Sequence, residues 1–353
     1  MNRGRTAPEK ILIICPNWVG DMVMATPSLK AMRQCYPHSS ISLLVRPHIR
    51  LVIEDLPYCD KIIVFDARGK ERGVRGILFC SRRLQKEHFD WVLILPNSFS
   101  SALLSFLSLI PRRIGYKRNM RSWMLTDRIP PAKNGTHIVP VPKVERYLTM
   151  CSYLGCKTPS QKYELAISPH VESKVDDLYL KYNLNKKNMT IVIIPGAAYG
   201  SSKCWKTEYF AQVADQLTEK YNCHIIIIPG PDEVTIARDI EKAMKHHPIA
   251  LTKEIVPLDV LKGIIKRSSL VITNDTGPRH FATAFEKPVV VIMGPTNPIY
   301  TQANLERTIV LREELDCSPC HLRECPTDHK CMELITPQKV LTACDKLIKK
   351  FLS

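Results

Sequence analysis

The sequence predicts an α/β protein made of two Rossmann-like lobes that face a central cleft. Short apolar runs alternate with segments of helical spacing in both halves, and such alternation predicts mainly parallel sheets covered by helices. The chain has 353 residues, which is too long for one ordinary core and suits two domains of roughly 150 to 200 residues. Proline-containing, weakly patterned stretches at 129–142 and 158–188 interrupt the alternation.

In the first half, strands and helices are expected in turn. Ile11 to Cys15 is a short apolar run, and Met22 to Cys35 has the spacing of a helix that packs through one face. The further expected strands are 41–45, 61–65, 91–95 and 163–167, and the further expected helices are 73–87, 98–109, 144–154 and 171–182. We place the domain boundary near residue 185, within the second weak stretch.

The second half repeats the pattern. The expected strands are 190–194, 224–229, 270–273 and 288–293, and the expected helices are 207–220, 233–246, 258–268, 278–285 and 337–351. The expected domains are therefore residues 1–185 and 186–336, with 337–353 as a closing helix. In paired Rossmann-type lobes the ligand binds at the carboxyl ends of the strands, so the cleft is the expected site.

The composition narrows the class of partner. The formal charge of +16 implies an acidic partner, which is nucleic acid, an anionic lipid surface or a phosphorylated substrate. No zinc-finger spacing, basic zipper or RNA-recognition aromatic pattern is present, so we do not expect nucleic acid. No apolar run approaches the ~20 residues of a membrane-spanning helix, and the N-terminus lacks the form of a signal peptide. These features predict a cytoplasmic protein.

The strongest local signal is the segment from Asn274 to His280, which joins an apolar strand to a helix. Asp275 or Thr276 is placed to cap the helix, and Gly277 lets the backbone approach a ligand. Free N–H groups at the helix start would then bind a phosphate. The alternative is an ordinary capped helix, although Arg279 and His280 are not needed for one.

Two further turns end strands of the same half. In the run from Pro195 to Lys203, small residues including Gly196 allow backbone contact with an anion, and Lys203 supplies a positive charge. A flexible surface loop is the alternative. After the next strand, Glu233 is placed where it could accept hydrogen bonds from a ribose. The alternative interpretation is that Glu233 only interacts favourably with the dipole of the helix that follows it.

In the first half, Gly20 and Asp21 lie at a strand-to-helix junction. A carboxylate beside a sugar hydroxyl can remove its proton as the hydroxyl attacks, which is general base catalysis. A helix residue favoured by the dipole is the competing interpretation of Asp21.

Together these motifs resemble the ADP-heptose:lipopolysaccharide heptosyltransferase family, glycosyltransferase family 9, and most closely its heptosyltransferase II branch. The resemblance covers nearly the whole chain and rests on several motifs in order. They are P-N-W-V-G-D-M-V-M-A-T-P from Pro16, L-P-N-S-F from Leu95, P-G-A-x-x-G-x-x-K-x-W from Pro195, N-D-T-G-P-R-H from Asn274 and G-P-T from Gly294. The lysine motif departs from the family's usual Arg-Trp-Pro ending, since Cys204-Trp205-Lys206 follows Lys203.

The resemblance implies an inverting transferase of the GT-B fold that needs no metal or other cofactor for catalysis. The N-terminal lobe would bind a lipid A–Kdo–heptose acceptor, and the C-terminal lobe would bind ADP-L-glycero-β-D-manno-heptose. The final helix would pack back on the first lobe. The protein would associate peripherally with the cytoplasmic face of the inner membrane.

The resemblance also implies roles for individual residues. Asp21 would be the base, and Lys203 would act on the donor phosphates. The expected donor-binding residues are Gly196, Lys203, Glu233, Asp275, Thr276, Gly277 and His280. The expected acceptor-side residues are Asn17, Gly20, Asn97, Arg113 and Arg118. Arg113 and Arg118, together with Lys117 and Arg121, are also candidates for contact with anionic groups.

Three questions stay open from the sequence. One is whether the chain is a related transferase of the same family that uses another nucleotide sugar or acceptor. Another is whether the chain is a basic membrane-surface module whose catalytic apparatus has decayed; the presence of Asp21 and Lys203 argues against this. The third is whether the clustered cysteines bind a metal, pack, or form a redox-sensitive loop. These cysteines are Cys317, Cys320, Cys325 and Cys331.

Overall fold

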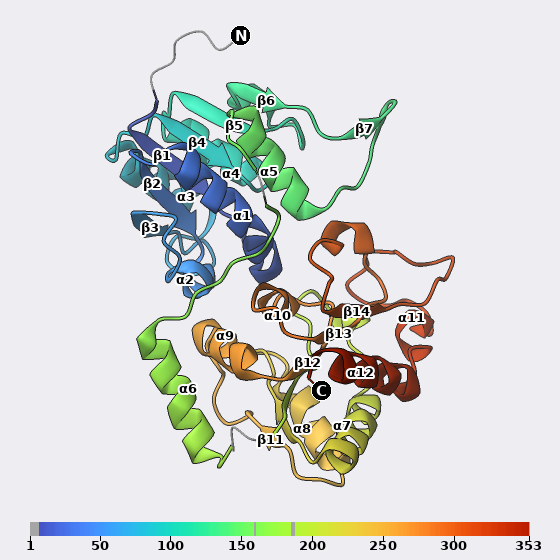
Figure 1. Cartoon of the computed structure of the whole chain (residues 1–353). Coiled ribbons are helices and arrows are strands. Elements are labelled where there is room, and N and C mark those ends of the chain that lie inside the picture. Colours follow the sequence, from blue (N-terminus) through green and yellow to red (C-terminus); the bar gives the residue numbers. More distant parts are fainter. Residues whose placement is uncertain (1–6, 159, 185–187, 353) are drawn as a thin grey trace. The chain divides into compact units, whose positions relative to one another are not determined.

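The computed structural model describes residues 7–158, 160–184 and 188–352, and these fall into two compact units (Figure 1). The first unit comprises Met1–Ala166 with Ile299–Ala303, and the second comprises Ile167–Pro298 with Asn304–Ser353. Each unit is built around one six-stranded sheet.

The first sheet has the strand order β3-β2-β1-β4-β5-β6, and every neighbouring pair is parallel. Its strands are β1 Lys10–Ile14, β2 Ser40–Val45, β3 Lys61–Val64, β4 Trp91–Ile94, β5 Arg112–Tyr116 and β6 Asp127–Ile129. The central strands are apolar on both sides because helices cover both faces of the sheet. The order reverses direction between β1 and β4, which is where such sheets bind ligands.

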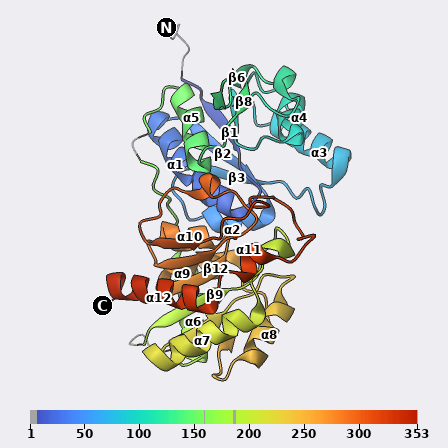
Figure 2. The same ribbon diagram turned by 90° about the vertical axis from the view of Figure 1, so that its right-hand side faces the viewer.

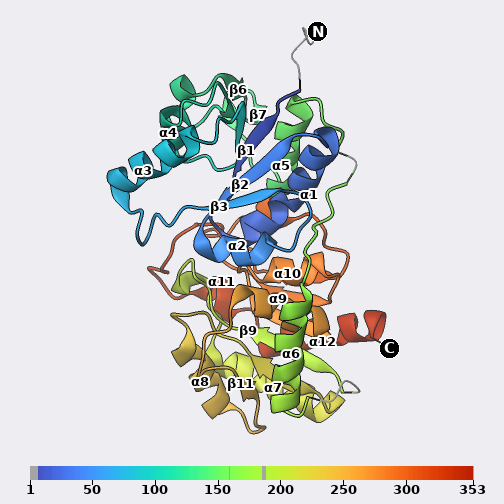
Figure 3. The same ribbon diagram turned by 90° about the vertical axis from the view of Figure 1, so that its left-hand side faces the viewer.

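Helices of the first unit lie on opposite faces of its sheet (Figures 2 and 3). Helices α1 (Val19–Cys35) and α5 (Lys143–Tyr153) pack against each other on one face. Helices α3 (Gly73–Gln85) and α4 (Phe99–Leu107) pack together on the other, where their apolar residues join those of the strands in one core. The remaining elements are α2 Pro47–Ile53, the 3-10 turn η1 Ser122–Met124 and the short β7–β8 pair, Lys133–Asn134 with His137–Ile138.

The second sheet repeats the same order as β11-β10-β9-β12-β13-β14, again with parallel pairs. Its strands are β9 Thr190–Ile194, β10 His224–Ile227, β11 Ile249–Ala250, β12 Leu270–Asn274, β13 Val289–Ile292 and β14 Thr308–Leu311. The helices are α6 Pro169–Lys181, α7 Thr207–Tyr221, α8 Val234–Ala243, α9 Leu258–Arg267, α10 Arg279–Ala284, α11 Lys330–Glu333 and α12 Pro337–Phe351, with 3-10 turns η2 Ser201–Lys203 and η3 Pro298–Thr301. Both units therefore have Rossmann-type topology, as predicted.

The division between the units falls earlier in the chain than expected. The expected boundary residue, 185, lies outside the described residues, whereas the contacts divide the chain after Ala166. Helix α6 belongs to the second unit because it packs on α9, where Gly263 leaves room for Val175. Ion pairs across the same contact include one between Arg267 and Asp176 at 2.6 Å.

The final helix, α12, was expected to pack back on the first lobe, and that expectation stays a prediction; the contacts that the structure describes are with its own unit. Helix α12 packs on α7, β13 and β14 of the second unit. Its buried face, which includes Val340, Cys344 and Leu347, is part of the apolar core that also contains Trp205 and Phe210. The amphipathic pattern of the helix is satisfied by its own sheet.

Several edge elements differ from the sequence expectation. Strands β5, β6 and β14 were not predicted, because β5 begins with two arginines and the residues of β14 are only half-buried. The expected strand at 163–167 is absent, although Tyr163 is buried. Short or half-polar strands carry too little apolar periodicity to be recognised.

Candidate active site

The end of β12 is joined to the turn after β9 through one buried side chain. Asn274 is the last residue of β12 and is fully buried. Its Nδ2 donates to the carbonyl of Pro195 at 2.5 Å, and its Oδ1 accepts from the amide of Trp205 at 3.3 Å. The two turns that the sequence singled out, after β9 and after β12, therefore form one site at the point where the strand order reverses.

A buried carboxylate lies at the centre of this site. Asp275 accepts from Lys203 Nζ at 2.8 Å, from Arg279 Nη1 at 2.6 Å and from Thr296 Oγ1 at 2.6 Å. Burial alone would raise the pKa of the Asp275 carboxyl, but the two cations and the hydrogen bonds outweigh burial and hold the pKa well below its ordinary value. One carboxylate and two cations leave the cluster with a net positive charge.

Lys203 lies in η2, at the end of the turn after β9. Its ammonium donates to the backbone carbonyl of Asp275 at 2.9 Å as well as to the carboxylate. It also lies 5.1 Å from the centroid of the Tyr199 ring. An ammonium has three donors, and these two hydrogen bonds occupy two of them among the described residues. The lysine is thus held in place with one donor available to an anion.

The start of α10 lacks the side-chain cap that the sequence predicted, whereas its part in anion binding stays a prediction. The helix begins at Arg279 and has six residues, and neither Asp275 nor Thr276 caps it. The amide of Thr276 donates to the carbonyl of Asn274 at 2.8 Å, and that of His280 donates to Gly277 at 3.1 Å. The amides of Thr276 and His280 are therefore already bonded within the turn.

Glu233 and Gly196 lie against each other at the ends of β10 and β9. A Cβ atom at Gly196 would come within 1.8 Å of the Glu233 carboxylate, so only glycine fits there. The carboxylate accepts from the amide of Gly230 at 2.7 Å. Burial raises the pKa of Glu233, although the hydrogen bond from Gly230 opposes the shift. The acidic group therefore lies next to the turn after β9.

In the first unit, the structure adds a partner for Asp21 that the sequence did not reveal. Asp21 lies in the first turn of α1, and Lys143 lies at the start of α5. Lys143 Nζ lies 2.5 Å from Asp21 Oδ1, and both side chains are mostly buried. The separation of 122 positions along the chain explains why no sequence pattern links the two residues. A carboxylate fixed in this way has a defined orientation for accepting a proton.

The asparagines expected on the acceptor side bind arginines of the same unit. Asn17 Oδ1 accepts from Arg46 Nε at 3.2 Å, and Asn97 Oδ1 accepts from Arg121 Nη2 at 3.2 Å. Arg121 is fully buried and donates to backbone carbonyls, among them that of Pro96 at 2.5 Å. Arg121 is therefore a structural residue, and the expectation that it contacts anionic groups is wrong.

The other expected acceptor-side residues differ in their surroundings. Gly20 is buried within α1. Arg113 donates to the carbonyls of Met124 at 2.7 Å and Ile110 at 2.6 Å, so its guanidinium is largely used within the fold. Arg118 is half-buried and lies on the loop after β5.

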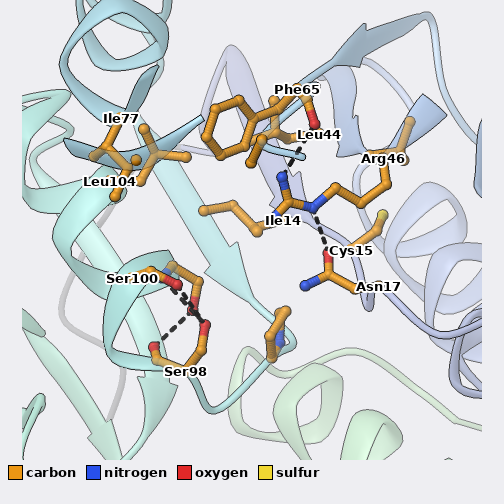
Figure 4. A pocket seen from close by; sticks show the side chains of 15 residues that line it. Ile14, Cys15, Asn17, Leu44, Arg46, Phe65, Ile77, Ser98, Ser100 and Leu104 are labelled. Atoms are coloured by element: carbon orange, nitrogen blue, oxygen red, sulfur yellow. Dashed lines mark hydrogen bonds between the residues drawn. The ribbon is translucent and has the colours of Figure 1, made fainter. Parts of the chain in front are cut away.

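A cavity of about 130 Å³ lies at the carboxyl ends of the first sheet's central strands (Figure 4). Apolar side chains that include Ile14, Phe65 and Leu104 line one part, whereas Arg46 and Ser98 line another. Arg46 Nη1 donates to the Phe65 carbonyl at 3.2 Å. A cavity with these two kinds of lining suits a molecule that carries both polar and apolar groups.

The clustered cysteines belong to a loop that supports the turn carrying Lys203. The amide of Ser202 donates to the Arg323 carbonyl at 3.0 Å, and His329 Nε2 lies 2.7 Å from the Ser202 carbonyl oxygen. Gly200 also approaches Arg323 too closely for a side chain. No group of three or more His, Cys, Asp or Glu side chains among the described residues is arranged to hold a metal ion. The contacts show a structural role for this loop.

Two units with the same Rossmann strand order, one of them carrying a cationic site at its switch point, have the architecture of the GT-B fold found in glycosyltransferases. The sequence model of glycosyltransferase family 9 (heptosyltransferase) matches residues 77–331. The chain belongs to this family. In the part of the chain that the structure describes, no helix has the length and apolar character needed to cross a membrane.

Comparison with individual proteins agrees with this assignment. The chain is 26% identical to lipopolysaccharide heptosyltransferase 2 of Escherichia coli over 349 residues, covering 96% of this chain and 98% of the relative. The solved structure of E. coli ADP-heptose LPS heptosyltransferase II superposes with a TM-score of 0.79 at 24% identity, covering 98% of this chain and all of that one. A family 9 glycosyltransferase from Veillonella parvula gives a TM-score of 0.82 at 23% identity, with 97% of each chain covered.

Proposed function

We propose that the protein transfers heptose from ADP-L-glycero-β-D-manno-heptose to the inner core of lipopolysaccharide, with inversion at the anomeric carbon. Support comes from family membership and from full-length relatives whose names describe lipopolysaccharide or lipooligosaccharide heptosyltransferase 2. The observation that carries the proposal is the Lys203–Asp275–Arg279 cluster, whose net positive charge suits a diphosphate leaving group.

In this proposal the second unit binds the donor. Lys203 binds the diphosphate and stabilises the charge that grows on it as the glycosidic bond breaks, which is electrostatic stabilisation by a preorganised group. Asp275 keeps the ammonium in position through two hydrogen bonds. Glu233, beside Gly196, accepts hydrogen bonds from the ribose, and Gly277 and His280 complete the donor site.

The first unit binds the acceptor, a lipid A–Kdo–heptose, and supplies the base. Asp21 removes the proton of the attacking hydroxyl, and the hydroxyl oxygen attacks the anomeric carbon on the face opposite ADP. Lys143 orients the carboxylate through their 2.5 Å contact. The cationic cluster supplies the neutralising charge in this mechanism, so no metal ion is assigned a step. We place the enzyme in the cytoplasm, peripherally bound to the inner membrane.

Two substitutions test these roles separately. Asp21→Ala should lower kcat by roughly 10²- to 10⁴-fold, the usual contribution of a general base, while ADP affinity measured by titration calorimetry stays nearly unchanged. Lys203→Ala should lower kcat/KM by about 10²- to 10³-fold and should also weaken ADP binding. Lys206→Ala is the matched control, because Lys206 lies three residues further along and pairs with Glu333 on the surface.

Either assignment can fail independently of the other. Normal turnover of Asp21→Ala would remove the base assignment. An unchanged ADP titration for Lys203→Ala would refute the donor role. A product assay that compares ADP-heptose with UDP- and GDP-sugars would show whether another nucleotide sugar is the donor.

A further inference from the structure

Helix α3 has an exposed apolar face in addition to its buried one. Gly76, Cys80 and Leu84 are buried against the sheet. On the outer side, Val74 is 70% exposed, Leu78 40% and Phe79 61%. These positions follow helical spacing, so they form one stripe along the helix. Large apolar side chains gathered on an outer surface indicate an interaction site.

Further exposed apolar residues lie on α4, which packs on α3, and around the 3-10 turn η1, which packs on α4. Phe99 and Phe106 on α4 are exposed, as are Trp123 in η1 and Met120 just before it. The rings of Phe106 and Trp123 are in edge contact, with centroids 5.4 Å apart. Helices α3 and α4 pack side by side on one face of the sheet (Figures 2 and 3). We call these apolar residues of α3, α4 and η1 the α3–α4 surface.

The α3–α4 surface lies within a strongly basic part of the chain. Residues 72–126 contain ten lysines and arginines but two acidic residues, Glu87 and Asp90. Both acids are used elsewhere, since Glu87 pairs with Lys61 at 2.6 Å and Asp90 accepts from the amides of Glu9 and Lys10.

Two arginines lie within the apolar stripe itself. Arg75 follows Val74 and Arg82 lies three residues after Phe79, and both are exposed. Neither forms an ion pair with any residue that the structure describes. Lys117 and Arg118 add positive charge on the loop after β5.

We infer that the α3–α4 surface docks on an anionic phospholipid membrane. A helix with exposed apolar residues and arginines on the same outer side has the composition of an interfacial helix, which inserts apolar side chains between headgroups and attracts anionic lipids. A second copy of the chain is disfavoured as the occupant, because two basic surfaces would repel each other. Nucleic acid would leave the aliphatic side chains Val74 and Leu78 without a partner.

The position of the α3–α4 surface fits the proposed reaction, on which this inference rests. Ile77 of α3 and Leu104 of α4 line the cavity at the carboxyl ends of the sheet. The same two helices thus contribute to the outer surface and to the cavity. An acceptor anchored in the bilayer by its acyl chains would present its sugars next to the enzyme that is docked there.

Vesicle sedimentation of the full chain tests the inference. The probe is phosphatidylcholine vesicles with about a quarter phosphatidylglycerol, against phosphatidylcholine alone. The wild-type chain should bind the anionic vesicles, and salt should weaken the binding. The double variant Arg75→Gln with Arg82→Gln should weaken vesicle binding about 30-fold, because each arginine near the membrane surface contributes roughly fivefold. Leu78→Ser with Phe79→Ser should weaken it at least about tenfold.

Matched substitutions on the second unit provide the controls. Leu180→Ser on α6 removes a leucine that is 75% exposed, and Lys349→Gln with Lys350→Gln removes two charges from α12. Both should change vesicle binding by less than about twofold. Turnover of a deacylated, water-soluble acceptor should be unchanged in the α3 variants, because they do not alter the proposed transfer chemistry.

Three results would overturn the inference. The first is a wild-type chain that ignores anionic vesicles at low salt, and the second is α3 variants that bind as the wild type does. The third is the finding that the chain forms a dimer in solution, or binds an oligonucleotide, and that Phe79→Ser abolishes this binding, because the α3–α4 surface would then have a different partner. Vesicle binding without turnover of ADP-heptose would refute the proposed function alone and would leave the docking surface standing.

Discussion

Replacing Asp275 by asparagine should destabilise the second unit severely. The substitution keeps the shape of the side chain but removes the charge that lies between Lys203 at 2.8 Å and Arg279 at 2.6 Å. The side chains of Lys203, Arg279 and Asp275 are all 12% exposed or less, so water screens the two cations poorly. Removing one partner of a buried pair costs about 3–5 kcal/mol, and two cations would be left facing each other.

Native-state hydrogen exchange of the β12 amides measures this effect, because β12 leads directly into the cluster. A loss of 3–5 kcal/mol corresponds to exchange that is roughly 10²- to 10³-fold faster or more, at about 1.4 kcal/mol for each factor of ten. Asp232→Asn, an exposed aspartate of the same unit, is the control and should exchange as the wild type does.

A double variant separates charge from packing. Adding Lys203→Met to Asp275→Asn removes one of the two unpaired cations, so part of the lost protection should return even though a second group has been changed. Exchange within about twofold of the wild type in Asp275→Asn would refute the reasoning, because the cluster would then contribute little. Exchange still faster in the double variant than in Asp275→Asn would also contradict it.

Three further predictions concern the base, the ribose site and pH. Lys143→Met should lower kcat without weakening ADP binding, and Lys143→Arg should keep most of the activity. If both variants had the kcat of the wild type, Lys143 would have no role in orienting Asp21. Gly196→Ala should cost about 1–3 kcal/mol in urea unfolding, because its Cβ would meet the Glu233 carboxylate, and adding Glu233→Ala should recover most of it. The pKa of Asp275 is lower in the folded than in the unfolded chain, so its stabilising effect is complete above about pH 4 and is lost as the pH falls further. The β12 exchange difference between wild type and Asp275→Asn should therefore narrow at acid pH and stay constant between neutral and mildly acidic pH.

The fold was largely predictable because the signals are local. Central strands such as β1, β9 and β12 are continuous apolar runs, which parallel sheets covered on both faces require. The turns after β9 and β12 were identified because their glycines and charged residues are contiguous in sequence, and parallel strands bring their carboxyl ends to one edge. The same rule explains why Lys203 and Asp275, which follow neighbouring strands, lie side by side in the structure.

What the sequence did not reveal depends on contacts between distant residues. The contact of Lys143 with Asp21 and the packing of α12 on its own sheet are set by tertiary structure. A cap on α10 was predicted from Asp275 and Thr276, because their residue types favour caps. In the structure the Asp275 carboxylate instead forms ion pairs with Lys203 and Arg279. A buried ion pair thus overrides a local propensity.

The central claim is that the chain moves heptose from ADP-heptose, and mass spectrometry of the reaction product tests it most directly. Incubation with ADP-heptose and a Kdo–lipid A or heptose-bearing acceptor should add one heptose and release ADP, whereas UDP- and GDP-sugars should give no product. The reaction should be lost in Asp21→Ala. Transfer from a UDP- or GDP-sugar in place of ADP-heptose, or no transfer from any donor, would contradict the account.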